Sequence, residues 1–190
     1  SSFQGVALFV FGALAAFVGL ETVGGWLRAR RRATGASAGR GWILAQMVAT
    51  GIGLHNLGEG LAIGAAFALG EATLGTVLIV GFMLHNTTEG LAIVAPLARE
   101  PVRVGRLLRL GVLGGAPTIV GAWVGGLIYS PIWSVLFLAL GAGAIAQVVV
   151  QLTRQVVGEE SVAGYVTTPP VAGGLFAGVT VMWVTGLVIG

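Results

Sequence analysis

The sequence contains no cysteine, lysine or aspartate, and only 9% of its 190 residues are charged. The absence of cysteine excludes disulfides, thiolate zinc sites and iron–sulfur clusters, so a metal ion would have to be bound by imidazole, carboxylate, amide or backbone groups. The scarcity of charge excludes an ordinary water-soluble domain, because 56% of the residues are hydrophobic and the mean hydropathy is +0.96. The sequence therefore predicts an integral membrane protein, with the lipid bilayer as its surroundings.

The charges that are present are ten arginines and seven glutamates. In a soluble protein, the sequence pI of about 10.6 would suggest nucleic-acid binding. Here the arginines cluster beside apolar segments, where such residues usually fix membrane topology. We therefore expect no nucleic-acid partner.

The chain divides into apolar segments of about the 20 residues that a helix needs to cross a bilayer. We expect one transmembrane domain over residues 1–190, an all-α, polytopic membrane helix bundle with an Arg-rich cytoplasmic loop over 28–40. The six expected transmembrane helices span residues 3–27, 42–69, 73–97, 107–128, 132–153 and 170–189.

The arginines fall in or beside the first, third and fifth joints between these segments, which lie on one side of the membrane. By the positive-inside rule that side is cytoplasmic, and both termini of the chain are expected outside. The expected location is the cytoplasmic (inner) membrane of a bacterium. The first apolar segment lacks a basic start and a cleavage site, so it is not a signal peptide. The absence of an initiating Met suggests that native sequence precedes Ser1.

The most informative feature is an internal repeat. Segment 55–63 (HNLGEGLAI) recurs as segment 85–93 (HNTTEGLAI), with seven of nine positions identical. Both copies lie near the middle of an expected transmembrane helix, where a carboxylate costs about 3 kcal/mol unless it has a partner. In each copy His and Glu are four residues apart and Asn and Glu three apart, so all three project from one helix face.

The joint between the two helices is short, so the helices are expected to be antiparallel neighbours. A pseudo-two-fold axis in the membrane plane would then bring the two polar faces together at mid-depth. The expected metal ligands are His55, Asn56, Glu59, His85, Asn86 and Glu89.

Imidazole, carboxylate and amide groups suit a divalent transition metal, with Zn²⁺ as the first candidate and Fe²⁺, Mn²⁺ or Cd²⁺ as others. Two glutamates balance the charge of one such ion, so we predict a mononuclear site. The ion would be the substrate, and no resident cofactor or catalytic residue is predicted. An alternative is that the polar residues form only a hydrogen-bonded clasp between the helices.

For several other polar residues and glycines, the sequence allows two interpretations each. Gln147 and Gln151 share a helix face and either line the ion pathway or form interhelical hydrogen bonds. Glu21 and Glu71 are each expected to be a solvated carboxylate, although they could attract cations to the pathway. Gly58, Gly60 and Gly90 either allow close packing or unwind a turn and expose carbonyl oxygens.

The pattern His-Asn-x-x-Glu-Gly, followed by a second His-x-x-x-Glu helix, resembles the fourth and fifth helices of the ZIP (Zrt/Irt-like) divalent metal transporters, particularly the GufA-like branch. The motif match covers residues 41–100, and the order of helices corresponds more weakly over the whole chain. The resemblance implies that the six helices correspond to helices three to eight of a ZIP transporter, whose first two helices this chain lacks. It also implies a homodimer, and a transport site of His55, Glu59, His85 and Glu89, with Asn56 and Asn86 lining an adjacent position.

The chain departs from the family pattern at several positions. Relatives usually have proline before the motif glutamate, where this chain has Gly58 and Thr88. An acidic residue is also replaced at Ala116, before Pro117, and at Gln151. Both replacements remove negative charge, which favours one bound ion over two.

The expected function is zinc transport by alternating access, in the direction of uptake into the cytoplasm, and not an enzymatic reaction. One alternative is an intramembrane metal-dependent hydrolase. The sequence lacks His-Glu-x-x-His, and metal binding would leave no obvious general base. Another alternative is a non-transporting metal sensor on a ZIP-like scaffold, which the absent helices and lost carboxylates favour.

Overall fold

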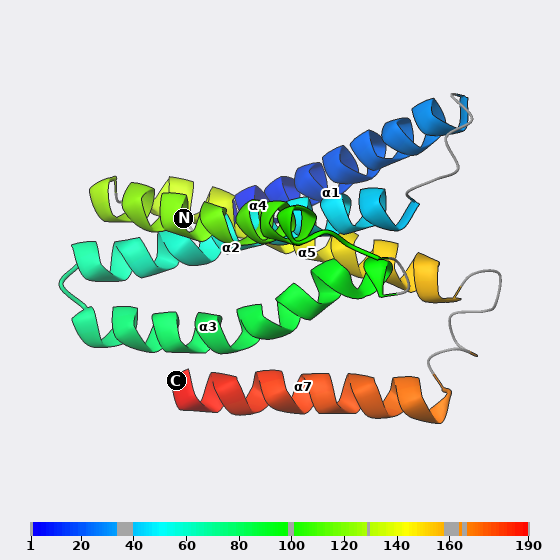
Figure 1. Cartoon of the computed structure of the whole chain (residues 1–190). Coiled ribbons are helices and arrows are strands. Elements are labelled where there is room, and N and C mark those ends of the chain that lie inside the picture. The colour runs from blue at the N-terminus through cyan, green and yellow to red at the C-terminus, as the bar shows by residue number, and fades with distance from the viewer. Residues whose placement is uncertain are drawn as a thin grey trace.

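The computed structural model describes residues 2–33, 40–98, 101–128, 130–157, 164 and 167–189. Throughout this part of the chain the regular structure is helical, which confirms the predicted all-α helix bundle (Figure 1). The elements are α1 (Ser2–Ala33), α2 (Arg40–Ala68), α3 (Ala72–Val94), the 3₁₀ turn η1 (Ala95–Leu97), α4 (Val104–Leu127), α5 (Pro131–Val157) and α7 (Pro169–Ile189).

The helix ends differ most from expectation around the Arg-rich segment 28–40. Helix α1 continues to Ala33, and α2 already includes Arg40, so much of the expected loop is helical. Arginine and alanine are among the strongest helix formers, which explains why the helix continues beyond its apolar part. The remaining residues of that segment, 34–39, lie outside the described chain.

Four of the described helices are long and apolar enough to cross a membrane: Gln4–Trp26, Ala72–Leu97, Val104–Leu127 and Pro131–Arg154. Helix α2 is less apolar because His55, Asn56 and Glu59 lie in its middle. In α7 the described apolar stretch is shorter, Pro169–Val181. These features identify a membrane protein.

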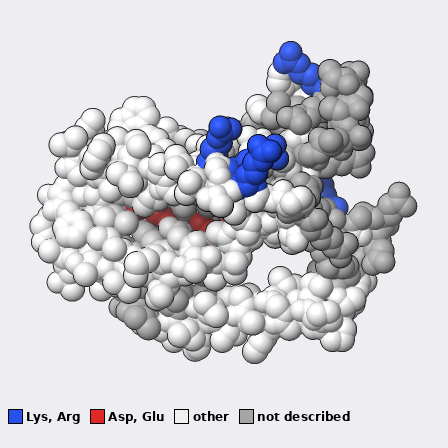
Figure 2. Space-filling model, viewed as in Figure 1, with Lys and Arg blue, Asp and Glu red and all other residues white. Residues whose placement is uncertain are grey.

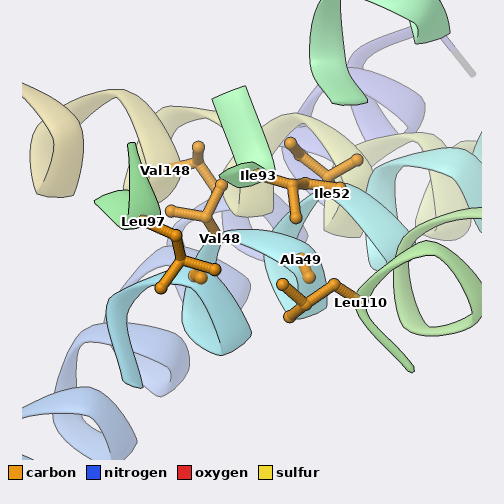
Figure 3. Close-up of a cluster of buried hydrophobic side chains, with 8 residues drawn as sticks. Val48, Ala49, Ile52, Ile93, Leu97, Leu110 and Val148 are labelled. Carbon is orange, nitrogen blue, oxygen red and sulfur yellow. The ribbon is translucent and has the colours of Figure 1, made fainter. Parts of the chain in front are cut away.

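Helix α2 is the central helix of the bundle and packs against α3, α4 and α5. The apolar core lies in its first half, where Val48 and Ile52 contact residues of the surrounding helices (Figure 3). Partners include Ile93 of α3, Leu110 of α4 and Val148 of α5. The polar repeat follows directly after this core, so the core fixes the start of the segment that carries the candidate ligands.

Glycines allow α2 and α4 to approach each other closely. A Cβ atom at Gly60 or Gly64 of α2 would overlap the backbone of α4, and one at Gly121 or Gly125 of α4 would overlap the backbone of α2. Small residues at such positions are the usual means of close helix packing in a bilayer. Helix α2 is continuous through Gly58 and Gly60, so the structure supports the packing interpretation and not an unwound turn.

Candidate metal centre

The site is built by the antiparallel pair α2 and α3, which the tight turn at Gly70 connects. Gly70 has a φ of 79°, a left-handed conformation that glycine adopts without strain. The N–H of Gly70 donates to Phe67 O and that of Glu71 to Ala66 O, which is a Schellman motif. His55 precedes Gly70 by as many residues as His85 follows it, so the antiparallel helices place both imidazoles at one depth.

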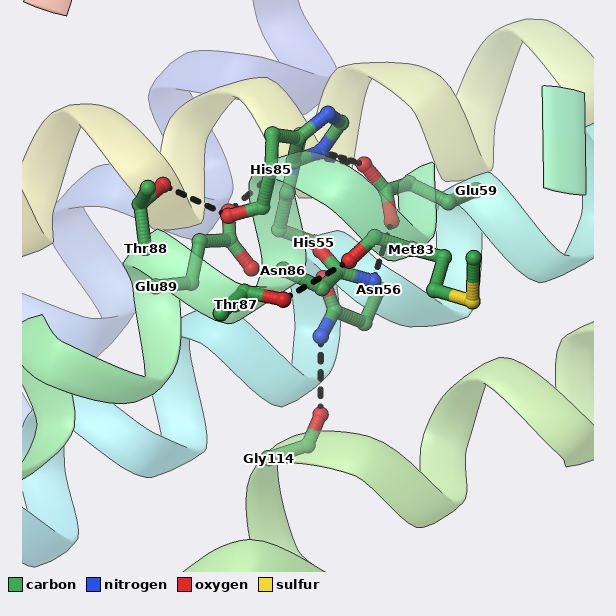
Figure 4. Close-up of polar contacts among 10 residues, drawn as sticks. All are labelled: His55, Asn56, Glu59, Met83, His85, Asn86, Thr87, Thr88, Glu89 and Gly114. Carbon is green, nitrogen blue, oxygen red and sulfur yellow. Dashed lines mark hydrogen bonds and ion pairs between the residues drawn. The ribbon is translucent and has the colours of Figure 1, made fainter. Parts of the chain in front are cut away.

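Glu59 is the centre of the polar cluster, with a side chain only 5% exposed. Its Oε1 lies 2.5 Å from His85 Nε2, and its Oε2 accepts a 3.1 Å hydrogen bond from Asn86 Nδ2 (Figure 4). His55 Nε2 lies 3.4 Å from the same Oε1, one helical turn earlier on α2. One carboxylate therefore contacts both imidazoles.

These contacts have dimensions close to those of a metal site. One ligand atom each from His55, Glu59 and His85 can be chosen so that all lie within 4.8 Å of one another. Ligands of a tetrahedral zinc ion at about 2.0–2.1 Å would be separated by about 3.3 Å. The 3.4 Å between His55 Nε2 and Glu59 Oε1 already matches this ligand-to-ligand distance. The ion would replace the hydrogen bond between His85 and Glu59 if these residues moved apart by roughly 1 Å.

Glu89 and the two asparagines also belong to the cluster, but they differ in the contacts that they form. Glu89 Oε1 lies 3.9 Å from His55 Nε2, and its buried Oε2 has no hydrogen-bond partner among the described residues. Asn86 donates to Glu59, but Asn56 donates instead to Gly114 O of α4, at 3.0 Å. The Oδ1 atoms of both asparagines are buried without a partner in the described chain. A cation would satisfy such oxygens, so they fit a metal site.

The cluster is accessible from one side of the bundle. Figure 2 shows acidic side chains at the bottom of a furrow in the surface. The side chain of His55 is 29% exposed and that of Glu89 is 16% exposed. An ion could therefore reach the ligands without unfolding of either helix.

Gln147 and Gln151 of α5 lie apart from these ligands. They line a cavity of about 350 Å³ between α1, α2, α4 and α5, beside Gln46 and Thr50 of α2. These α2 residues precede His55, so the cavity lies toward the Arg-bearing end of the bundle. Gln151 is buried, and neither polar atom of its side chain has a partner among the described residues.

Glu21 differs from the expected solvated carboxylate. Its side chain is only 26% exposed, accepts a 3.2 Å hydrogen bond from Gln147 Nε2 and pairs with Arg154. This contact joins α1 to α5. The spacing of residues within one helix could not predict this contact, because the partners are more than 120 positions apart in the sequence.

The comparisons with known proteins identify no relative: no family model, curated protein or solved structure matches this chain. The resemblance to the ZIP family therefore depends on the repeat motif and, more weakly, on the order of the helices.

Proposed function

We propose that this chain transports divalent transition-metal ions, with Zn²⁺ as the favoured substrate, through the site between α2 and α3. The observation that carries this proposal is the convergence of His55, Glu59 and His85 from two antiparallel helices, with ligand atoms within 4.8 Å of one another. Ionisable residues inside a membrane are costly and usually mark an ion pathway. A purely structural clasp would not need the buried, unpartnered oxygens that surround these ligands.

The ligand set suits binding and exchange of one ion. Two imidazoles and a carboxylate replace part of the ion's hydration shell, and imidazole favours zinc and its neighbours over Ca²⁺ or Mg²⁺. Glu59 and Glu89 together balance one divalent charge, so the site is mononuclear. The partial exposure of His55 leaves a side of the ion accessible, as release requires.

We infer that an ion would leave this site through the cavity beside Gln147 and Gln151, because that cavity lies toward the Arg-bearing side. Neutral amide oxygens are weaker ligands for a transition metal than imidazole or carboxylate, so an ion entering the cavity would be held loosely and released. The positive-inside rule makes the Arg-bearing side cytoplasmic and places the termini outside. Transport would be uptake across the bacterial inner membrane by alternating access, as the ZIP-like motif suggests.

The test is zinc flux into proteoliposomes containing the full chain, with Glu59→Gln as the site variant. Glu71→Gln is the matched control, because Glu71 is exposed in the turn and forms no side-chain capping bond. The proposal predicts that Glu59→Gln abolishes flux and that Glu71→Gln retains it. Equal flux in all three proteins would contradict this site. Absence of flux in the unmodified protein, with zinc still bound, would overturn transport and indicate a metal sensor.

A further inference from the structure

A second cavity lies on the outside of the bundle, between α2 and α4 toward their N-terminal ends. It has a volume of about 470 Å³ and contains none of the proposed metal ligands. Its polar part is formed by Trp42 and Gln46 of α2 and Arg109 of α4, and its apolar part includes Leu108 and Val112. Among the described residues, no carboxylate lines it.

The polar part of this cavity is strongly basic. The guanidinium of Arg106 lies 5.2 Å above the ring of Trp42, which places a second positive charge beside Arg109. Arg103 is the N-cap residue of α4, three residues before Arg106. All three arginines are exposed, and within the described part of the chain none forms an ion pair with a carboxylate.

The apolar part extends from these arginines toward the middle of the bundle. Leu108 and Val112, one turn apart on α4, are each 64% exposed, so they face the lipid phase. Trp42 is half-buried near the Arg-bearing end of α2, the kind of position that tryptophan favours at a membrane interface. The cavity thus has positive charge at its membrane-surface end and aliphatic side chains below.

We propose that this cavity binds an anionic phospholipid. The phosphate would lie between Arg106 and Arg109, Gln46 would donate to a headgroup oxygen, and an acyl chain would follow Leu108 and Val112. Basic pockets between transmembrane helices on the cytoplasmic side are known to bind acidic headgroups. The negative headgroup complements the unpaired arginines, and the acyl chain complements the apolar wall, which a free anion would leave uncovered.

The protein offers a matched control for this proposal. Arg30 lies 5.1 Å above the ring of Trp26, so it forms the same kind of cation–π pair as Arg106 and Trp42. Neither Arg30 nor Trp26 lines the cavity. Arg30→Gln therefore removes the same charge from the same side of the bundle without altering the proposed site.

The experiment is lipid retention by the full chain, measured by native mass spectrometry with dioleoyl phosphatidylglycerol or dioleoyl phosphatidylcholine at matched ratios. We expect one phosphatidylglycerol to be retained preferentially. An arginine near an acidic surface contributes about fivefold in affinity. Retention should therefore fall at least fivefold in both Arg106→Gln and Arg109→Gln and stay unchanged in Arg30→Gln. Arg109→Lys, which keeps the charge, should retain most of the binding.

Three results would overturn the proposal. Equal retention of the two lipids would show that the headgroup charge is not recognised. An equal loss in Arg30→Gln would show that only the overall charge matters. Displacement of phosphatidylglycerol by millimolar inorganic phosphate would identify a small-anion site instead. Helix content measured by circular dichroism identifies a variant that fails to fold, and Arg106→Gln and Arg109→Gln test the site independently of each other.

Discussion

Replacing Gly121 by alanine should destabilise the bundle, although the change adds a single methyl group. The new Cβ would overlap Leu57 O and lie 2.9 Å from Leu61 N and 3.1 Å from Gly60 Cα. These are backbone atoms of α2, so no side chain can rotate away, and the helices would have to separate by about 1 Å. Overpacking of this kind costs about 1–3 kcal/mol.

The assay is the free energy of unfolding in mixed micelles, with Gly115→Ala as the control. A Cβ at Gly115 would meet no atom within 4 Å, and the two variants share the same helix and the same chemical change. The change in helix propensity therefore cancels in the comparison. Because Gly60 follows Glu59, the displacement should also weaken zinc binding. Stabilities of the two variants within about 0.5 kcal/mol of each other would refute the close packing of α2 and α4.

Three further substitutions test polar contacts of α5 and α2 by the same unfolding assay. Gln147→Leu removes a donor to Glu21 and should cost about 1 kcal/mol, whereas Gln151→Leu should be neutral or stabilising, since its buried polar atoms have no partner among the described residues. A larger loss of stability in Gln151→Leu than in Gln147→Leu would contradict the assigned contacts. Asn56→Leu removes the bond to Gly114 O and should also cost about 1 kcal/mol. An unchanged stability would show that this bond does not hold α2 against α4.

Much of the helix arrangement could be predicted from the sequence, because apolar segments of membrane-spanning length are unambiguous. The meeting of the two repeat copies was also predictable. A repeat on two helices joined by a short turn must place its copies opposite each other, and Gly70 supplies that turn.

The unequal roles of the two copies could not be predicted. Segments 55–63 and 85–93 are nearly identical, yet only α2 packs closely along α4, so Asn56 donates to α4 whereas Asn86 donates to Glu59. The Glu21 contact was missed for a similar reason. Contacts between distant helices depend on packing, which residue spacing within one helix does not reveal.

His55, Glu59 and His85 are proposed to bind one divalent ion together. X-ray absorption at the zinc edge, on the full chain loaded with one equivalent of Zn²⁺, measures the ligands of that ion. We expect two imidazole nitrogens and carboxylate oxygen at about 2.0–2.1 Å, with the imidazole signal reduced in His85→Gln. A shell of oxygen atoms alone, with no imidazole signal, would contradict the proposed site.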